Sequence, residues 1–469
     1  MKPLKNATIL LITIIIISSA AAIGYNQNWF QTSNPTLRPT PETDMNFTLE
    51  IYGNANMDNK IDQKDIAYIQ DIIADIKPTT TFADANRDGS IDQKDIDIIN
   101  TIINGTFSQM HLLDGNGKNI TITHPPNRVI IEYIQNAELA RILQIQDKIV
   151  GVDFCVDQLK TIYFPENTNN IKTVGNMNTP DYEAILNLNP DILLTFSNAT
   201  SEKASKLPGV DVIYLGLYYP NVLDPVHSEY IQAILKAGYI FNKVNQATSY
   251  TNWLLDLTNA INVKTSTLTA TQKQSVFITN YPYTASTTLK AYMTIDTLGQ
   301  ACILAGGNNI ASTLPTYLTA TSADVDAEWI LQQNPSYIFL HTVRYTYAAT
   351  TNADPAQGID VNDATSIRNC LEQWRSQEQI TNLAAVKNNN VYIISGDFRN
   401  NAMGGTLGAV YIAKILYPDL LSDINPQTIH QDYITNYLHL NYNLDKNGVF
   451  LYPAITDNGD TLGIPNGAK

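Results

Sequence analysis

Two short stretches of the chain carry oxygen-bearing side chains at the spacing of a calcium-binding loop. Residues 54–65 and 84–95 align without a gap, and the second stretch begins 30 residues after the first. Calcium takes roughly six to eight hard oxygen ligands, which such a loop supplies from side chains at positions 1, 3, 5, 9 and 12 and from the backbone carbonyl at position 7. The residues at these positions are Asn54, Asn56, Asp58, Lys60, Asp62 and Asp65 in the first loop, and Asp84, Asn86, Asp88, Ser90, Asp92 and Asp95 in the second. The sequence therefore predicts two calcium sites.

The second loop has the better ligand set. Gly89 supplies its sharp turn, whereas Asn59 stands at that position of the first loop, and Asn54 replaces an acidic residue there. Asparagine tolerates a left-handed backbone, so the first loop can still form the turn. The alternative is that these Asp and Asn residues only form turns and helix caps, which would explain one copy but does not easily explain two copies in register.

A helix must follow each loop and hold it, because apolar residues continue from both loops at helical spacing. These residues are Ile66, Ile69, Ile73 and Ile76 after the first loop, and Ile96, Ile99 and Ile103 after the second. Pro78 and Gly105 lie just beyond the expected helix ends. We expect two loop-helix units that pack against each other.

These two units, at residues 49–106, resemble the dockerin module. The likeness is carried by Gly53-Asn-Ala-Asn-Met-Asp and Asp84-Ala-Asn-Arg-Asp-Gly, with a helix after each loop and none before it. The resemblance implies a cohesin domain as partner, contacted through Gln63, Lys64, Gln93 and Lys94. The alternative is that these polar side chains are solvated and have no partner.

The start of the chain is predicted to direct export. Lys2 and Lys5 precede an uncharged, mostly apolar run over residues 7–25, so residues 1–25 are either a signal peptide or an N-terminal membrane anchor. No cysteine follows this run, which argues against a lipoprotein anchor. Residues 26–48 are polar and contain several prolines, which predicts a linker. We therefore expect an extracytoplasmic protein, at the cell surface or anchored to the membrane.

From His111 onward, short runs typical of β-strands alternate with helical stretches, which favours parallel-sheet α/β lobes. Strands are expected at residues 128–132, 148–152, 191–195 and 210–215, and in a second series at residues 274–280, 336–341 and 390–394. A longer helical stretch, broken near Gly238 or Asn245, lies between the two series. We expect an N-terminal lobe at residues 111–224, a long interlobe helix at 225–263 and a C-terminal lobe at 264–469.

Motifs between His111 and about Ile455 resemble, in the same order, those of the periplasmic-binding family of iron-chelate and cobalamin ABC importers. They include Leu113-Asp-Gly-Asn-Gly-Lys, Tyr182-Glu-Ala-Ile-Leu-Asn-Leu-Asn-Pro, Ala327-Glu-Trp-Ile-Leu-Gln-Gln-Asn-Pro and Leu407-Gly-Ala-Val-Tyr-Ile-Ala. The resemblance implies a bilobed α/β periplasmic-binding fold, here preceded by a small α-helical dockerin-like calcium module. It also implies a protein that is not an enzyme and that captures a ferric siderophore, haem or cobalamin for an ABC permease.

Composition and motif content agree with a binding protein. The net charge of −15 argues against a nucleic-acid partner, which would need a basic face. The chain contains no GxSxG, HExxH or phosphate-binding GxxxxGK motif, and its six histidines are scattered. The three cysteines lack the spacing of a zinc cluster. These observations give no support to catalysis or to direct zinc binding.

The resemblance also implies two kinds of functional residue. Glu183 and Glu328, one in each lobe, stand where the family contacts arginines of the permease, although a solvated glutamate is also favoured near a helix N-terminus. The ligand site is expected on loops at strand ends that face the cleft between the lobes. The candidate ligand-binding residues are Tyr133, Phe154, Tyr218, Tyr283, Arg344, Tyr345 and Arg399. Aromatic rings suit a flat macrocycle or a catecholate shell, and arginine suits an anionic chelate.

Two other functions remain open at this stage. The chain could be a surface scaffolding or adhesion protein that assembles through dockerin-cohesin pairing, or a cell-surface component of polysaccharide degradation. Presence of both Glu183 and Glu328 favours the receptor over the scaffold. The lack of a paired-carboxylate motif is only weak evidence against a glycosidase, because glycosidase acids need not be close in sequence.

Overall fold

The computed structural model describes residues 45–218, 220–281, 288–342, 356–400, 403–457 and 459–468. The predicted signal peptide or anchor at residues 1–25 and most of the predicted linker lie outside these residues, as do Tyr283, Arg344 and Tyr345. Asp44–Lys469 form one compact unit. None of the described helices combines the length and the apolar character that crossing a bilayer requires.

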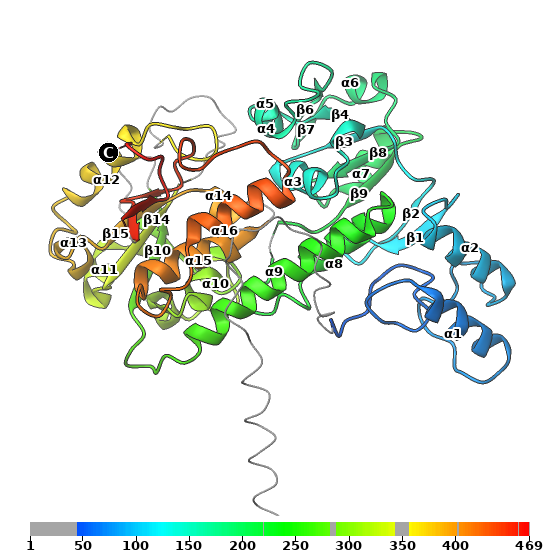
Figure 1. The fold of residues 1–469 in the computed structure, drawn as a ribbon, viewed down its shortest axis with the longest axis horizontal. Coiled ribbons are helices and arrows are strands. Elements are labelled where there is room, and N and C mark those ends of the chain that lie inside the picture. The colour runs from blue at the N-terminus through cyan, green and yellow to red at the C-terminus, as the bar shows by residue number, and fades with distance from the viewer. Residues whose placement is uncertain are drawn as a thin grey trace, which may run out of the picture. The chain divides into compact units, whose positions relative to one another are not determined.

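Five parallel strands form the sheet of the N-terminal lobe, in the order β5-β4-β3-β8-β9 (Figure 1). Ile130 and Leu193 face one core and Ile131 and Leu194 face another, so the sheet is covered on both sides. Burial on both faces explains why these strands read as unbroken apolar runs. The elements are β3 (Val129–Ile131), α3 (Ile134–Ile142), a 3-10 turn (Gln146–Lys148), β4 (Ile149–Val152), α4 (Phe154–Asp157), α5 (Lys160–Tyr163), β5 (Lys172–Thr173), β6 (Gly175–Asn176), β7 (Thr179–Pro180), α6 (Tyr182–Asn187), β8 (Ile192–Thr195), α7 (Thr200–Lys206) and β9 (Asp211–Tyr214).

The C-terminal lobe has a second five-stranded sheet, in the order β12-β10-β14-β15-β16. Its strands are parallel except β16, which runs antiparallel to β15. The elements are β10 (Ser275–Asn280), β11 (Thr288–Tyr292), α10 (Thr297–Leu304), β12 (Asn308–Asn309), a 3-10 turn (Ile310–Thr313), β13 (Ser322–Asp326), α11 (Ala327–Gln333), β14 (Tyr337–His341), α12 (Thr365–Arg375), α13 (Ala384–Lys387), β15 (Val391–Ile394), α14 (Asp397–Asn400), α15 (Gly404–Leu416), α16 (Pro426–Asp432), a π-helical turn (Tyr433–Tyr437), β16 (Leu451–Tyr452), β17 (Ile455–Asp457) and β18 (Asp460–Leu462). The two series of strands predicted from the sequence thus form two separate sheets.

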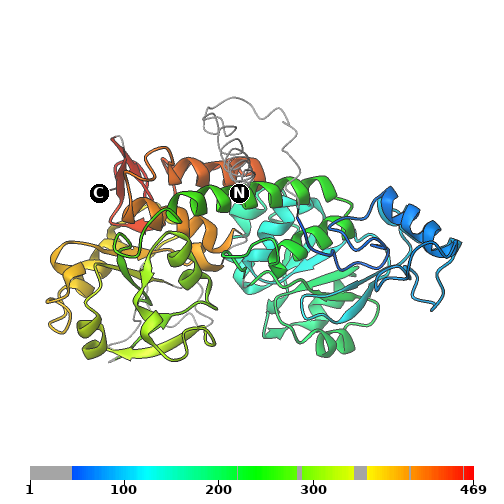
Figure 2. The ribbon, with the colours of Figure 1, turned by 90° about the horizontal axis from the view of Figure 1, so that it is seen from below.

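The helical stretch expected at residues 225–263 consists of two helices rather than one long helix, and the break lies between Gly238 and Asn245, near which it was expected. The two helices are α8 (Glu229–Ile240) and α9 (Val244–Thr265), and they extend along the lobes (Figure 2). Asn242 between them has a φ angle of 53°, a left-handed conformation that asparagine tolerates and that a continuous helix excludes. α9 packs against α3 of the N-terminal lobe and against α10 and α15 of the C-terminal lobe.

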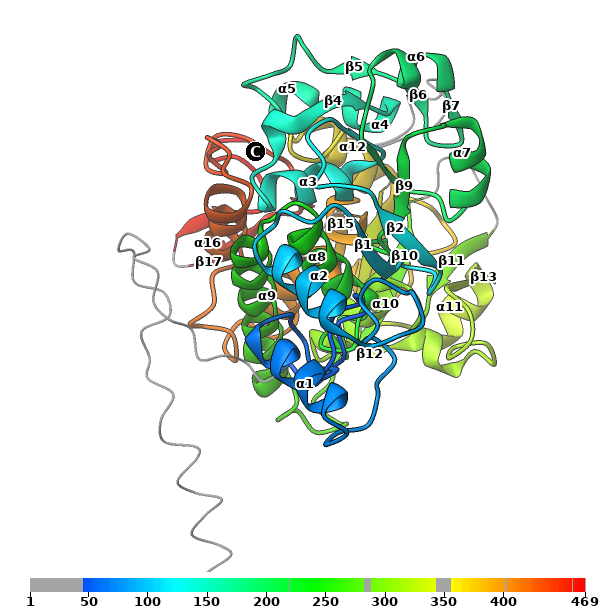
Figure 3. The ribbon, with the colours of Figure 1, turned by 90° about the vertical axis from the view of Figure 1, so that its right-hand side faces the viewer.

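The predicted loop-helix units form α1 (Gln63–Ile73) and α2 (Gln93–Ile103), which pack against each other (Figure 3). Each helix begins at an aspartate, Asp62 or Asp92, in a reciprocal capping box with the aspartate three residues later. The predicted apolar stripe needs one correction in α1: Ile72 is buried, whereas Ile73 and Ile76 are 48% and 71% exposed. The buried isoleucines of this short helix are spaced three residues apart, at positions 66, 69 and 72.

The loop-helix units share a continuous apolar core with the N-terminal lobe. Backbone pairing of Ile51 with Leu112 adds a short strand to the hairpin of β1 (Met110–Leu113) and β2 (Asn119–Ile122). On α8, the ammonium of Lys236 lies 2.7 Å from a carboxylate oxygen of Glu50, and the hydroxyl of Tyr239 accepts a 2.7 Å hydrogen bond from the backbone N–H of Ile61. These contacts make residues 45–106 continuous in structure with the two lobes.

Candidate ligand-binding site and calcium loops

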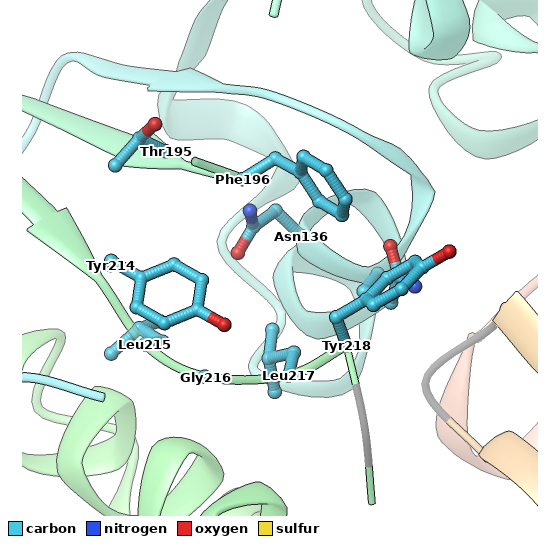
Figure 4. A pocket seen from close by; sticks show the side chains of 9 residues that line it. Asn136, Thr195, Phe196, Tyr214, Leu215, Gly216, Leu217 and Tyr218 are labelled. Carbon is cyan, nitrogen blue, oxygen red and sulfur yellow. The ribbon is translucent and has the colours of Figure 1, made fainter. Parts of the chain in front are cut away.

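A hollow lies at the carboxyl ends of β8 and β9, beside the start of α3 (Figure 4). Its cavity volume is small, about 10 Å³. Its lining residues are Gln135, Asn136, Thr195, Phe196, Tyr214, Leu215, Gly216, Leu217 and Tyr218. None of these side chains carries a charge, and the position of the hollow at strand carboxyl ends is the usual place for a ligand site in an open α/β sheet.

Three aromatic rings gather at this edge of the sheet. The ring of Phe196 lies 4.5 Å from that of Tyr133 and 5.0 Å from that of Tyr218, between ring centroids. The backbone of Tyr133 has φ 69° and ψ 160°, a region that is strained for every residue except glycine. Its N–H donates to the carboxylate of Asp153 at 3.1 Å, and burial raises the pKa of Asp153 to about 6. A strained residue held at a strand end marks this edge as a candidate functional site.

A buried ion pair lies beneath the hollow. The ammonium of Lys203 is 2.6 Å from both carboxylate oxygens of Glu132, and the two side chains are 5% and 2% exposed. The same carboxylate accepts hydrogen bonds from the Thr195 hydroxyl at 2.8 Å and from the Phe196 N–H at 3.0 Å. Lys203 also donates to the backbone oxygen of Met177 at 3.0 Å. The pair therefore holds the end of β8 in place while leaving no net charge under the hollow.

On the C-terminal lobe, Arg399 forms a two-point ion pair with Asp296, at 3.0 and 2.5 Å. Burial alone would lower the pKa of Arg399, but the adjacent Asp296 carboxylate outweighs burial and the pKa is raised. The guanidinium lies over the ring of Tyr292, 5.1 Å from its centroid, and Tyr292 approaches His341 at 3.3 Å. Burial and the nearby Arg399 hold the pKa of His341 well below its usual range. The charge of Arg399, which was expected to attract an anionic chelate, is therefore compensated by Asp296 inside the lobe.

Of the predicted ligand-binding residues, the structure brings Tyr133 and Tyr218 together at the hollow. Tyr218 also contributes to the pKa shift of Arg399, so Arg399 lies near the same edge. Phe154 begins α4, is 39% exposed and does not line the hollow. The ligand-binding residues predicted from the sequence do not include Gln135, Asn136 or Phe196. Phe196 directly follows a predicted strand, so the criterion that selected Tyr133, a position at a strand end, also applies to it. Gln135 and Asn136 lie on the first turn of a helix, where no sequence pattern indicates a ligand contact.

Hydrogen bonds across the lobe junction hold the two lobes together. Arg141 of α3, which is 1% exposed, donates to the backbone oxygens of Leu438 and His439 at 2.7 Å each. Glu138, also of α3, accepts hydrogen bonds from the hydroxyls of Tyr163 and Tyr433 at 2.8 and 2.9 Å. Buried charges held by residues nearly 300 positions away fix the mutual placement of the lobes, which agrees with a rigid scaffold.

The second loop has the oxygen-bearing side chains that calcium prefers, and its backbone turns around Asp84. The backbone is left-handed at Arg87 and Gly89, and the carboxylate of Asp84 accepts hydrogen bonds from the N–H groups of Asp88 and Gly89 at 3.1 and 2.9 Å. Two further turns are closed in the same way. The side-chain oxygen of Asn86 accepts a hydrogen bond from the N–H of Asp88, and a carboxylate oxygen of Asp88 accepts one from the N–H of Ser90. The loop is thus wound around hard oxygen donors, as a calcium ion would require.

The first loop fits less well. The amide nitrogen of Asn54 donates to the backbone oxygens of Leu49 and Asp58, at 2.8 and 2.6 Å. Contrary to expectation, Asn59 does not adopt the left-handed turn, because its side chain donates to the backbone oxygen of Met45 at 2.8 Å. Asp65 is fully buried, and burial raises its pKa to about 7. Within the described residues, no three His, Cys, Asp or Glu side chains already converge as a metal site.

The two predicted docking glutamates occupy equivalent places in the two lobes. Glu183 and Glu328 lie in the first turns of α6 and α11, each two residues after a capping aspartate, Asp181 or Asp326. Both glutamates are exposed. Gln63, Lys64, Gln93 and Lys94, the predicted cohesin-facing residues, are likewise exposed.

Comparison with known proteins agrees with this architecture. A family model described as "Periplasmic binding protein" matches residues 129–397. An uncharacterized ABC transporter substrate-binding lipoprotein of Bacillus subtilis, YvrC, is 25% identical over 168 residues, which cover 35% of this chain and 50% of that protein. The chain therefore spans about half the length of this curated relative.

Solved structures share the fold at low sequence identity. A TroA-like periplasmic binding protein, FepB, from Veillonella parvula superposes with a TM-score of 0.57 at 16% identity, covering 73% of this chain and 98% of that one. The molybdate periplasmic binding protein MolA of Haemophilus influenzae superposes with a TM-score of 0.54 at 18% identity, covering 71% and 99%. These likenesses support the bilobed α/β architecture.

Proposed function

The chain belongs to the periplasmic binding protein family, whose members serve ABC transporters as non-enzymatic substrate-binding proteins, and we propose that it captures a metal chelate outside the cytoplasm. The observation that carries this proposal is the hollow at the carboxyl ends of the N-terminal strands, which Phe196 and Tyr218 line and whose two rings Tyr133 contacts. Its aromatic wall suits the apolar surface of a ferric siderophore, haem or cobalamin.

Ligands in related folds support a metal-containing ligand. MolA is described as bound to molybdate, and a Helicobacter pylori protein, CeuE, which superposes with a TM-score of 0.52, is described in a nickel-histidine complex. Membership of a non-enzymatic family favours a receptor over a component of polysaccharide degradation. The N-terminal run at residues 1–25 would keep such a receptor at the membrane or direct its export.

Calorimetric titration with a ferric siderophore, haem and cobalamin tests the proposed ligand class. We expect one class to bind with micromolar or lower Kd, equivalent to about 8 kcal/mol or more. Calorimetry is preferable to tryptophan fluorescence because none of the residues lining the hollow is a tryptophan. Absence of binding by all three classes would favour the scaffolding alternative.

Residues 49–106 are proposed to bind calcium and to serve as a dockerin-like module. Loop two would hold the ion through Asp84, Asn86, Asp88, the carbonyl of Ser90, Asp92 and Asp95, and bound calcium would offset the repulsion among these carboxylates. The exposed set Gln63, Lys64, Gln93 and Lys94 is available to a cohesin domain.

Replacing one oxygen donor in each loop tests the calcium proposal. Asp84→Ala is expected to weaken calcium binding more than Asn54→Ala, because Asp84 supplies a charged carboxylate whereas Asn54 supplies only a neutral amide oxygen. Calcium titration by calorimetry measures both losses. Equal losses, or no calcium binding by the unmodified protein, would contradict the assignment of the loops.

A further inference from the structure

The hollow contains a buried amide that the described residues leave without a hydrogen-bond partner. Gln135 is 2% exposed, and neither its Nε2 nor its Oε1 has a partner among these residues. Because both atoms lack partners, this observation does not depend on which way the amide is turned. A buried polar group without a partner is costly, and native proteins rarely retain one without a reason.

Asn136 adds a second available acceptor to the same hollow. Its Nδ2 donates to the backbone oxygen of Glu132 at 2.8 Å, which fixes the orientation of the side chain. Its Oδ1 has no partner within the part of the chain that the structure describes, and the residue is 5% exposed. The hollow thus offers one donor and two acceptors from neighbouring residues on the first turn of α3.

Charge around the hollow indicates what kind of group can enter. All nine lining residues are uncharged, and Glu132 and Lys203 neutralise each other beneath Thr195. Burial and the nearby carboxylates of Asp114 and Glu229 raise the pKa of Tyr214, so the uncompensated charge near the hollow is negative. An anionic ligand group placed here would lose its hydration without gaining a counter-ion. A neutral group with hydrogen-bonding edges would lose much less.

We propose that this hollow is a subsite for an uncharged ligand group that presents an N–H or O–H donor beside a carbonyl acceptor, such as a carboxamide or a hydroxamate. The group pairs with the two edges of the Gln135 amide, while the rings of Phe196 and Tyr218 cover its apolar part. The subsite makes the receptor select chelates with a neutral outer surface over anionic ones. This proposal rests on the proposed capture of a metal chelate.

Variants of Gln135 in the full chain test the subsite. Gln135→Leu removes both hydrogen-bonding edges at similar volume, and Gln135→Glu adds a negative charge. The probes are an uncharged ferric trihydroxamate, the carboxamide-bearing corrinoid cobalamin, and a trianionic ferric tricatecholate. Gln158→Leu, at an exposed glutamine that ends α4, is the matched control.

The unmodified protein is expected to bind a neutral probe at least about tenfold more tightly than the tricatecholate. Gln135→Leu should weaken neutral-probe binding by about tenfold to a hundredfold, which is the range for a lost buried hydrogen-bond pair. Gln135→Glu should weaken tricatecholate binding further, and Gln158→Leu should change neither. Thermal unfolding checks that each variant folds; Gln135→Leu should be at least as stable as the unmodified protein, because it removes an unpaired polar group.

The remaining outcomes distinguish failure of the proposed function from failure of the proposed subsite. If no chelate binds the unmodified protein, the proposed function fails. If chelates bind but Gln135→Leu leaves affinity and selectivity unchanged, Gln135 holds a bound water only and the subsite proposal is overturned while the function stands. Tighter binding of the tricatecholate by the unmodified protein would also overturn the subsite.

Discussion

The double variant Glu183→Arg/Glu328→Arg is expected to lose ligand uptake through its ABC permease while binding the ligand as tightly as the unmodified protein. Both glutamates are exposed in the first turns of equivalent helices, α6 and α11, so their carboxylates are available to cationic residues of a membrane partner. Reversing two charges turns attraction into repulsion at both contacts, which should reduce uptake to background. Uptake of labelled ligand into vesicles containing the permease, together with calorimetry of the soluble receptor, measures the two properties separately.

A matched control keeps the change in net charge the same. Asp147→Arg/Glu378→Arg reverses one exposed acidic residue in each lobe outside the two docking helices, and it should leave uptake largely unchanged. Arginine near a helix N-terminus opposes the helix dipole by up to about 1 kcal/mol, so thermal unfolding of both variants should be compared. Retained uptake by the Glu183/Glu328 variant, or weakened ligand binding, would refute the docking role.

Lys203→Met is expected to lower the free energy of unfolding by about 3–5 kcal/mol, because it leaves the Glu132 carboxylate buried without its counter-charge. Glu132 is 2% exposed and cannot recover this interaction with water. The strand end that carries Thr195 and Phe196 depends on the same carboxylate, so ligand affinity should fall as well. Urea unfolding followed by circular dichroism gives the change in stability, and calorimetry gives the change in affinity.

Lys206→Met is the matched control on the same helix. Lys206 pairs with Glu202 at the surface and lies over the Tyr182 ring, and removing it should cost at most about 1 kcal/mol. Combining Lys203→Met with Glu132→Gln removes the unpaired charge but keeps an acceptor for Thr195 and Phe196, and should restore part of the lost stability. Similar losses for Lys203→Met and Lys206→Met would show that the buried pair has no special role.

The candidate site could be predicted from the sequence only in part. Tyr133 and Tyr218 were found because each follows a predicted strand, and strand ends face the ligand in this class of sheet. Gln135 and Asn136 were missed because a polar residue on the first helical turn is normally solvated. Arg399 was selected for its charge, yet its partner Asp296 is 103 residues away and no local pattern pairs them.

The sequence by itself determined the features that depend on a few neighbouring residues: the strand runs of both lobes, the repeated loops, and the capping aspartates Asp62 and Asp92. Backbone sterics and hydrogen bonds within one turn set these features. Only the tertiary structure decided that Lys203 neutralises Glu132 across 71 residues, and that Gln135 is buried without a partner among the described residues. These outcomes depend on which surfaces pack together, because burial and charge pairing are settled by contacts between segments far apart in the chain.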